Sequence, residues 1–258
     1  MGKIIKVSDE IFDKQLEQLP KEVTFCKKCV ISNQRPRIRW GLKEDGVCSA
    51  CDYAYEKDNE IDWDERERQL QKVCDEHRSA NGSWDVIVPS SGGKDSGMVA
   101  HKLKYKYGMH PLTITWAPFI YTEIGWKNFI ALKDKGFDNI LVHPDGILHR
   151  KLSLLAFDLH GDAWDPFGYG QQYLAYHLSV KYNIPLIFFG ENGEIEYGGE
   201  DKHKNMVEAP MEDWEEIFYK GSSAQKLVDA GLKRNIFTKE EIASSSFDFY
   251  QPPKKEDL

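Results

Sequence analysis

The most informative run of residues in this chain is Val86-Ile87-Val88-Pro89-Ser90-Ser91-Gly92-Gly93-Lys94-Asp95-Ser96. An apolar run leads into a turn of small residues, and the apolar positions Val99, Leu103 and Tyr107 then predict a helix over 95–107. A helix that starts directly after a strand leaves several backbone N–H groups unpaired at the positive end of its dipole. Such a turn suits a phosphate group, so the sequence predicts an anion-binding loop between a strand and a helix.

The residue types within this loop support the same interpretation. Its two glycines allow the backbone to approach an anion closely, and its hydroxyl groups add hydrogen-bond donors. Lys94 can place a positive charge on phosphate groups, and Asp95 can hold a magnesium ion or cap the helix. An ordinary strand-to-helix turn rich in glycine and serine is the plainer alternative. The predicted nucleotide contacts of this loop are Ser90, Ser91, Gly92, Gly93, Lys94, Asp95 and Ser96.

The spacing of the loop is neither G-x-x-x-x-G-K-[ST] nor G-x-G-x-x-G. The string Ser91-Gly92-Gly93-Lys94-Asp95-Ser96 instead resembles the PP-loop of ATP pyrophosphatases. These enzymes cleave ATP between its α and β phosphates and adenylylate a substrate oxygen. The resemblance implies that the bound nucleotide is ATP and that Lys94 and Asp95 are catalytic residues.

The composition is that of a soluble globular protein. The chain has 258 residues, of which 41% are hydrophobic and 29% charged, enough for one substantial α/β domain and a small satellite. No apolar run reaches membrane-spanning length and the first residues do not form a signal peptide, so we expect a cytoplasmic protein with no membrane partner. The net charge of -8 weighs against nucleic acid as the main partner, although a local basic patch can coexist with it.

Four of the five cysteines form two Cys-x-x-Cys pairs, Cys26 with Cys29 and Cys48 with Cys51. This spacing indicates a tetrahedral zinc site of the ribbon or knuckle kind, which is structural because four thiolates leave no open position. A cytoplasmic setting disfavours the competing interpretation of disulfides. Iron–sulfur ligation stays open. The fifth cysteine, Cys74, lies outside the pairs and we interpret it as a bystander.

Three parts follow along the chain. Residues 1–80 hold an N-terminal helix over 7–24, the cysteine module and a connecting helix over 63–77. Residues 81–246 form the predicted PP-loop domain, in which strands and helices alternate as in a doubly wound parallel sheet. Residues 247–258 form a tail that we do not expect to be a packed helix.

The predicted strands of the sheet domain are 85–89, 112–116, 140–142 and 185–189. Its predicted helices are 95–107, 123–135, 147–159, 170–182, 211–220 and 222–230. Thr238 and Glu241 have the spacing of a capping box, which predicts one more helix start.

Ligands of open α/β sheets gather at the carboxyl ends of the strands, near the point where the strand order reverses. We therefore expect the loops 90–96, 116–122 and 190–199 to meet. Trp116 can offer an aromatic face to adenine, although core packing explains this side chain almost as well.

The loop that begins at Gly190 places carboxylates directly after a predicted strand. Carboxylates that face a triphosphate require a cation between them, so the sequence predicts Mg²⁺ held by Asp95 together with Glu191 or Glu194. A solvated acidic turn is the alternative. We count Gly190 among the nucleotide contacts and Glu191 among the catalytic residues.

Several strings together extend the resemblance to one family. They resemble the N-acetyl sugar amidotransferases, PP-loop enzymes of bacterial surface-polysaccharide (O-antigen, lipopolysaccharide) and nonulosonic-acid synthesis, over residues 22–253. The resemblance implies an enzyme that converts an acetamido group of a nucleotide-linked or acidic sugar into an acetamidino group, with AMP and pyrophosphate as products. The strings are Phe25-Cys26-Lys27-Lys28-Cys29-Val30, Thr115-Trp116-Ala117-Pro118, Gly125-Trp126-Lys127-Asn128 and Phe189-Gly190-Glu191-Asn192.

Members of that family resemble partners of a glutaminase and an ammonia-channelling synthase subunit. This chain has no cysteine after Cys74 that could serve a glutaminase, so we expect ammonia from a separate protein or from solution. Family members generally extend further at the C-terminus. Two other functions stay open: a tRNA sulfur-transferase, which usually has further cysteines and a basic surface, and a non-catalytic module that holds nucleotide.

Overall fold

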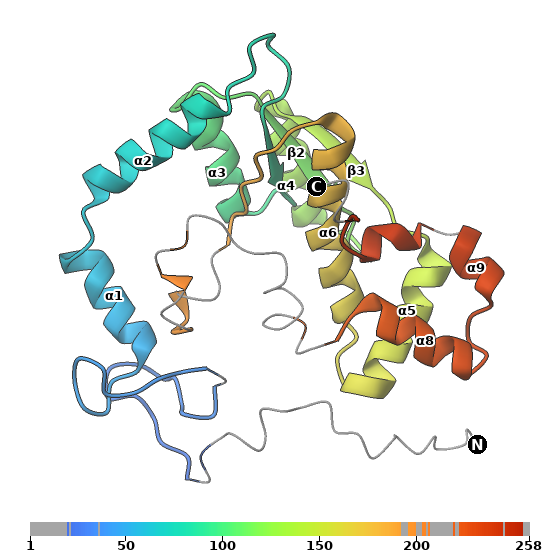
Figure 1. Ribbon diagram of the computed structural model, residues 1–258, viewed down its shortest axis with the longest axis horizontal. Coiled ribbons are helices and arrows are strands. Elements are labelled where there is room, and N and C mark those ends of the chain that lie inside the picture. The colour runs from blue at the N-terminus through green and yellow to red at the C-terminus, as the bar shows by residue number, and fades with distance from the viewer. Residues whose placement is uncertain are drawn as a thin grey trace. The chain divides into compact units, whose positions relative to one another are not determined.

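The computed structural model divides the chain into two compact units, which are described separately (Figure 1). The sheet unit comprises the described residues of Leu70–Glu191 and Glu215–Leu258, and the cysteine unit those of Ser8–Gln69 and Asn192–Trp214. This division differs from the predicted boundary near residue 80. The predicted helices 7–24 and 211–220 lie almost entirely outside the described residues. The structure describes residues 20, 22–35, 37–191, 196–199, 203–204, 206, 219, 222–244 and 246–254.

The sheet unit is built on three parallel strands, β1 (Val86–Pro89), β2 (Pro111–Trp116) and β3 (Asp138–Val142), in that order. Ile87 lies opposite Leu112, which sets the register of the first pair. All six residues of β2 are buried, as expected for a central parallel strand. The predicted α/β class with a parallel sheet is therefore confirmed, while its assignment to the PP-loop type stays a prediction.

The fourth predicted strand, 185–189, pairs with β1 through a single parallel bridge between Ile87 and Ile187. The N–H of Ile87 donates to Leu186 O and the N–H of Phe188 donates to Ile87 O, each at 2.9 Å. Leu186 and Phe188 face β1 in this ladder, so the missing N–H of Pro185 lies on the outer edge of the segment, where proline is tolerated. The segment adds to β1 on the edge away from β2, so the chain reverses direction across the sheet at β1.

Helices cover both faces of this sheet. Val86 and Val88 of β1 pack with Ala100 and Leu103 of one helix. Ile87 of β1 and Trp116 of β2 point to the other face, where a Cβ on Gly170 of α6 (Asp165–Tyr182) would collide with the Trp116 ring. The helices of this unit are α3 (Lys94–Tyr105), α4 (Glu123–Asp134), α5 (Gly146–His160), α6 (Asp165–Tyr182), α8 (Ala224–Lys233) and α9 (Lys239–Ser244).

The helix starts follow local sequence signals. Thr122 accepts a hydrogen bond from the N–H of Gly125 at the start of α4, and Asp145 caps α5 in the same way. The predicted capping box is confirmed: Thr238 N–H donates to Glu241 Oε2 at 2.9 Å, and Glu241 N–H donates to Thr238 Oγ1 at 3.1 Å.

Among the described residues, no helix is long and apolar enough to cross a membrane.

The C-terminal residues pack against the sheet unit as one 3-10 turn, η3 (Phe247–Tyr250). Tyr250 is fully buried, and its hydroxyl is 2.8 Å from Nδ1 of His149 on α5. Burial lowers the pKa of His149 to about 4, so this histidine is neutral. The tail that we did not expect to be a packed helix thus contains a short packed turn, because two of its aromatic side chains are buried.

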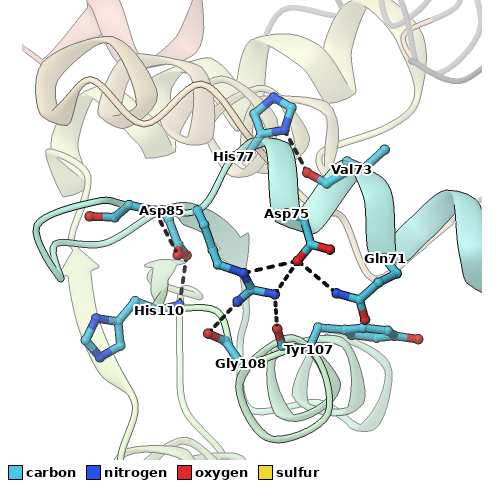
Figure 2. A network of polar contacts seen from close by, with 10 residues as sticks. Gln71, Val73, Asp75, His77, Asp85, Tyr107, Gly108 and His110 are labelled. Carbon is cyan, nitrogen blue, oxygen red and sulfur yellow. Dashed lines mark hydrogen bonds and ion pairs between the residues drawn. The ribbon is translucent and has the colours of Figure 1, made fainter.

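A polar network holds the end of α2 (Trp63–Glu76) to the sheet unit (Figure 2). The Arg78 guanidinium donates to Gly108 O at 2.7 Å, to Tyr107 O at 2.5 Å and to Asp75 Oδ1 at 2.8 Å. The two carbonyls belong to the turn after α3, where Gly108 takes a positive φ of 66°. These bonds explain why the residues just before β1 group with the sheet.

We expect Arg78→Ala to lower the free energy of unfolding by about 2 kcal/mol, because two backbone carbonyls lose a charged donor. Arg68→Ala is the matched control, since Arg68 pairs only with exposed groups along α2 and its loss costs about 0.5 kcal/mol or less. Chemical denaturation followed by circular dichroism measures both values. Equal effects of the two substitutions would contradict the role given to Arg78.

Candidate functional site

The loop after β1 starts from a firmly held residue, Ser90, which is buried. Its N–H donates to Ile114 O at 2.8 Å and thereby continues the pairing of β1 with β2. Its hydroxyl lies 2.9 Å from the hydroxyl of Ser96 and accepts the N–H of Gly92 at 3.3 Å. One side chain therefore ties the beginning of the loop to its middle and to the first turn of α3.

Gly92 is the residue of the loop that requires glycine. Its φ is +84°, and a Cβ there would lie 2.7 Å from the backbone nitrogen of Phe129 on α4. Gly93 caps α3 with φ -68°, where an added Cβ would meet only Ser91 Oγ at 3.5 Å. The loop is thus pressed against α4 on one side, while Ser91 and Gly93 are exposed.

The chain after the 185–189 segment reaches the same turn. A Cβ on Gly190 would lie 2.8 Å from Ser96 N and 3.1 Å from the carbonyl carbon of Asp95. Glu191 follows directly and is exposed. Of the three loops predicted to meet, 90–96 and 190–199 come together at Gly190, where the strand order reverses. The meeting of 116–122 with them stays a prediction.

The charged residues of the loop face solvent. Lys94 Nζ lies 2.7 Å from Asp95 Oδ1, with the two side chains 87% and 54% exposed. Both residues stand in the first turn of α3, and Glu191 follows Gly190, which contacts that turn. Magnesium ligation by Asp95 and Glu191 stays a prediction, and Glu194 lies outside the described residues.

Trp116 belongs to the core in this structure. It is 4% exposed, its ring packs edge-on against Tyr250 with ring centroids 5.3 Å apart, and it lies against Gly170. A different aromatic group lies next to the loop. Phe129, whose backbone contacts Gly92, packs with Tyr121 and Trp126, and Trp126 is 45% exposed. Adenine contact by Trp116 stays a prediction.

The sequence analysis did not identify Thr115, whose hydroxyl holds the first residue of the loop. The hydroxyl of Thr115, in the middle of the apolar β2 run, donates to Ser90 O at 2.5 Å. Asn139 of β3 in turn donates to Thr115 Oγ1 and to Thr113 Oγ1, each at 3.0 Å. The alternation of threonine with larger apolar residues along 112–116 is the one signal that could have indicated this buried polar ladder.

The four paired cysteines lie together in the cysteine unit. Ligand atoms of Cys26, Cys29, Cys48 and Cys51 all lie within 4.8 Å of one another, and the thiols are not joined as disulfides. Cys48 caps α1 (Ser49–Asn59) and Cys51 stands in its first turn. The predicted four-cysteine cluster is confirmed, and it can hold a structural metal ion such as zinc.

The environment of the thiols suits a metal ion. Burial raises the pKa of Cys26, but hydrogen bonds from the backbone N–H groups of Lys28 and Cys48 outweigh it and lower that pKa to about 6. Burial, with the neighbouring thiols, raises the pKa of Cys51. Four thiolates this close repel one another, and a divalent cation at their centre removes that repulsion.

Comparisons with known proteins name no relative. No model of a known protein family matches the chain, and a search of curated proteins finds no match. The chain combines a strand-to-helix loop at the sheet reversal with a four-cysteine cluster in the other compact unit.

We expect the purified chain to carry about one zinc ion, and Cys26→Ala to lose it because three thiolates hold the ion more weakly than four. Cys74→Ala is the control, since Cys74 is buried in the sheet unit apart from the cluster. Elemental analysis by mass spectrometry reads out the metal. Full zinc retention by the Cys26 variant would rule out this site.

The two glycines of the loop provide a second test. Gly92→Ala should lower the free energy of unfolding by about 3 kcal/mol, since its Cβ would combine a left-handed backbone with overlap on α4. Gly93→Ala should cost less than about 1 kcal/mol, because its φ is ordinary and its Cβ fits. Thermal and urea unfolding compare the two. A reversed order would show that the loop is not held against Phe129.

Proposed function

We propose that the chain binds ATP with Mg²⁺ at the loop after β1 and adenylylates the oxygen of an acetamido group on a sugar. The observation that carries the proposal is the approach of Gly190 to the first turn of α3. It brings the residue before Glu191 against Asp95 and Ser96 at the start of α3, where backbone N–H groups can bind a phosphate group. The resemblance to N-acetyl sugar amidotransferases supplies the substrate class.

The reaction needs activation because an amide oxygen is a poor leaving group. The oxygen of the acetamido group attacks the α-phosphorus of ATP, and the bond to the β-phosphate oxygen breaks to release pyrophosphate. Ammonia then adds to the carbon of the resulting imidate, loses a proton, and AMP departs with the former amide oxygen. The product is the acetamidino group, and no side-chain nucleophile takes part.

The residues of the loop have separate roles in this scheme. Backbone N–H groups at the start of α3 bind the departing pyrophosphate, and Lys94 neutralises part of its charge. Asp95 and Glu191 hold Mg²⁺, which neutralises further charge on the phosphates when bound. Ser90 and Thr115 keep the loop in position through their mutual hydrogen bond.

The source of ammonia is part of the same proposal. We assign it to a separate glutaminase acting with a synthase-like subunit. The reason is that no cysteine follows Cys74 that could serve as the nucleophile of a glutaminase. Ammonium salt replaces these partners in a purified reaction. Turnover by the isolated chain with glutamine alone would contradict this assignment.

The assay uses the full chain with MgATP, ammonium chloride and UDP-linked acetamido sugars in neutral and uronic-acid forms. We expect pyrophosphate and AMP in equal amounts, and a sugar that has exchanged one oxygen for an NH group in its mass spectrum. Lys94→Ala should slow pyrophosphate release roughly 100-fold through lost charge stabilisation. Lys102→Ala, on an exposed position later in α3, is the matched control. Nucleotide binding without any turnover would favour a module that only holds nucleotide.

A further inference from the structure

We propose that the outward face of α5 is the contact between two copies of this chain, which pair α5 with α5 in antiparallel orientation about Leu154. The contact lies wholly within the sheet unit and does not depend on the function proposed above. The apolar side chains of this face and the order of its charges along the helix carry the proposal.

The inner face of α5 fills the core of the sheet unit. On this side the helix packs against α6 and α8. The packing against α8 is close, since a Cβ on Gly231 would lie 3.1 Å from Leu155 Cδ2. The buried residues of α5 are Leu148, His149, Leu152, Leu155 and Ala156, which recur at the spacing of one helix face.

The opposite face of α5 is apolar as well, although it is exposed. Ile147 is 62% exposed, and Leu154 and Phe157 are each 60% exposed. The outward positions 147, 150, 154 and 157 are separated by three, four and three residues, so they form one stripe along the helix. A surface helix usually presents polar groups on its outer side, so an apolar stripe here indicates a partner.

The spacing of this stripe is that of a seam between two helices. Ile147 and Leu154 are seven residues apart, and so are Arg150 and Phe157. This is the repeat of the a and d positions at which two helices pack side by side. α5 has 15 residues, so two such helices can stay in contact over about four turns. The partner that the stripe fits is therefore another helix.

The charges along α5 favour a second copy of this chain as that partner. Arg150 and Asp158 are exposed, and neither side chain forms an ion pair within the described part of the chain. Arg150 precedes Leu154 by four residues, and Asp158 follows it by four. A two-fold axis at Leu154 between antiparallel helices therefore places each Arg150 opposite the Asp158 of the second copy. One sequence thus supplies both members of two ion pairs.

The same charges disfavour a parallel arrangement. Two parallel helices in register would place arginine beside arginine and aspartate beside aspartate, and both pairs repel. Antiparallel helices also bring the opposite ends of their dipoles together. In the antiparallel pair, Leu154 and Phe157 supply the apolar centre, and the two ion pairs on either side of it fix the register.

The test is sedimentation equilibrium of the full, zinc-loaded chain from about 1 to about 100 µM, because one helix face per copy is smaller than a standard interface and predicts a dissociation constant in the micromolar range. We expect the average mass to rise with concentration from 29.8 kDa, the mass of one chain, toward twice that value.

Leu154→Glu should remain a monomer throughout, because it places two carboxylates at the axis. Leu154 is exposed, so this substitution leaves the core intact, which circular dichroism verifies. Ile124→Glu is the matched control, since Ile124 is a 71% exposed aliphatic residue in the first turn of α4. It should dimerise as the unaltered chain does.

An exchange of charges tests the orientation of the two helices. Arg150→Glu and Asp158→Arg should each weaken dimerisation about tenfold, because each substitution creates two like-charge pairs across the contact. The double substitution Arg150→Glu/Asp158→Arg restores both ion pairs with reversed polarity. It should recover the affinity to within about threefold.

A chain that stays monomeric over the whole concentration range would overturn the proposal. Undiminished dimerisation of Leu154→Glu would show that the contact lies elsewhere and would overturn it as well. A double substitution that dimerises no better than either single one would exclude the antiparallel pairing. A mass that rises beyond two chains would contradict a contact closed by a two-fold axis.

Discussion

The geometry of the candidate site depends on the close approach of the 185–190 segment to the start of α3. A side chain on Gly190 would overlap Ser96 N, so the two backbones touch directly. The contact forms because the segment pairs with β1 on the edge away from β2, which places its carboxyl end beside the loop. An α/β sheet binds ligands at such a reversal because no strand or crossover helix fills the space between the two diverging loops.

The loop after β1 is held in place by contacts from three parts of the sheet unit. Thr115 donates a hydrogen bond to Ser90 O, Gly92 packs against the backbone of α4, and Gly190 packs against the first turn of α3. Reorganisation during catalysis is costly, so a loop that is already in place favours charge stabilisation of a departing pyrophosphate. A reaction that activates an amide by adenylylation needs this kind of positioning more than it needs a nucleophile.

The cysteine unit has a different task in this scheme. Its four thiols could supply all the ligands of one tetrahedral metal ion, the arrangement of a structural site such as that of zinc. The hydrogen bond from Ser49 to Gly198 O joins the segment 196–199 to the residues between Cys48 and Cys51. A small module that cannot build a large core can gain rigidity from a bound metal ion.

Local features of this protein followed from the sequence alone: the three strands, most helices, the Thr238–Glu241 capping box and the four-cysteine cluster. They depend on residues close together in the chain, or on a spacing that repeats. The single bridge at Ile187, the buried role of Trp116, the packed turn at Tyr250 and the supports at Thr115 and Gly198 were decided only by the tertiary structure. A glycine or threonine gives the same sequence pattern whether it faces solvent or contacts a backbone far away in the chain. Its role depends on the distant partner, which local sequence does not show.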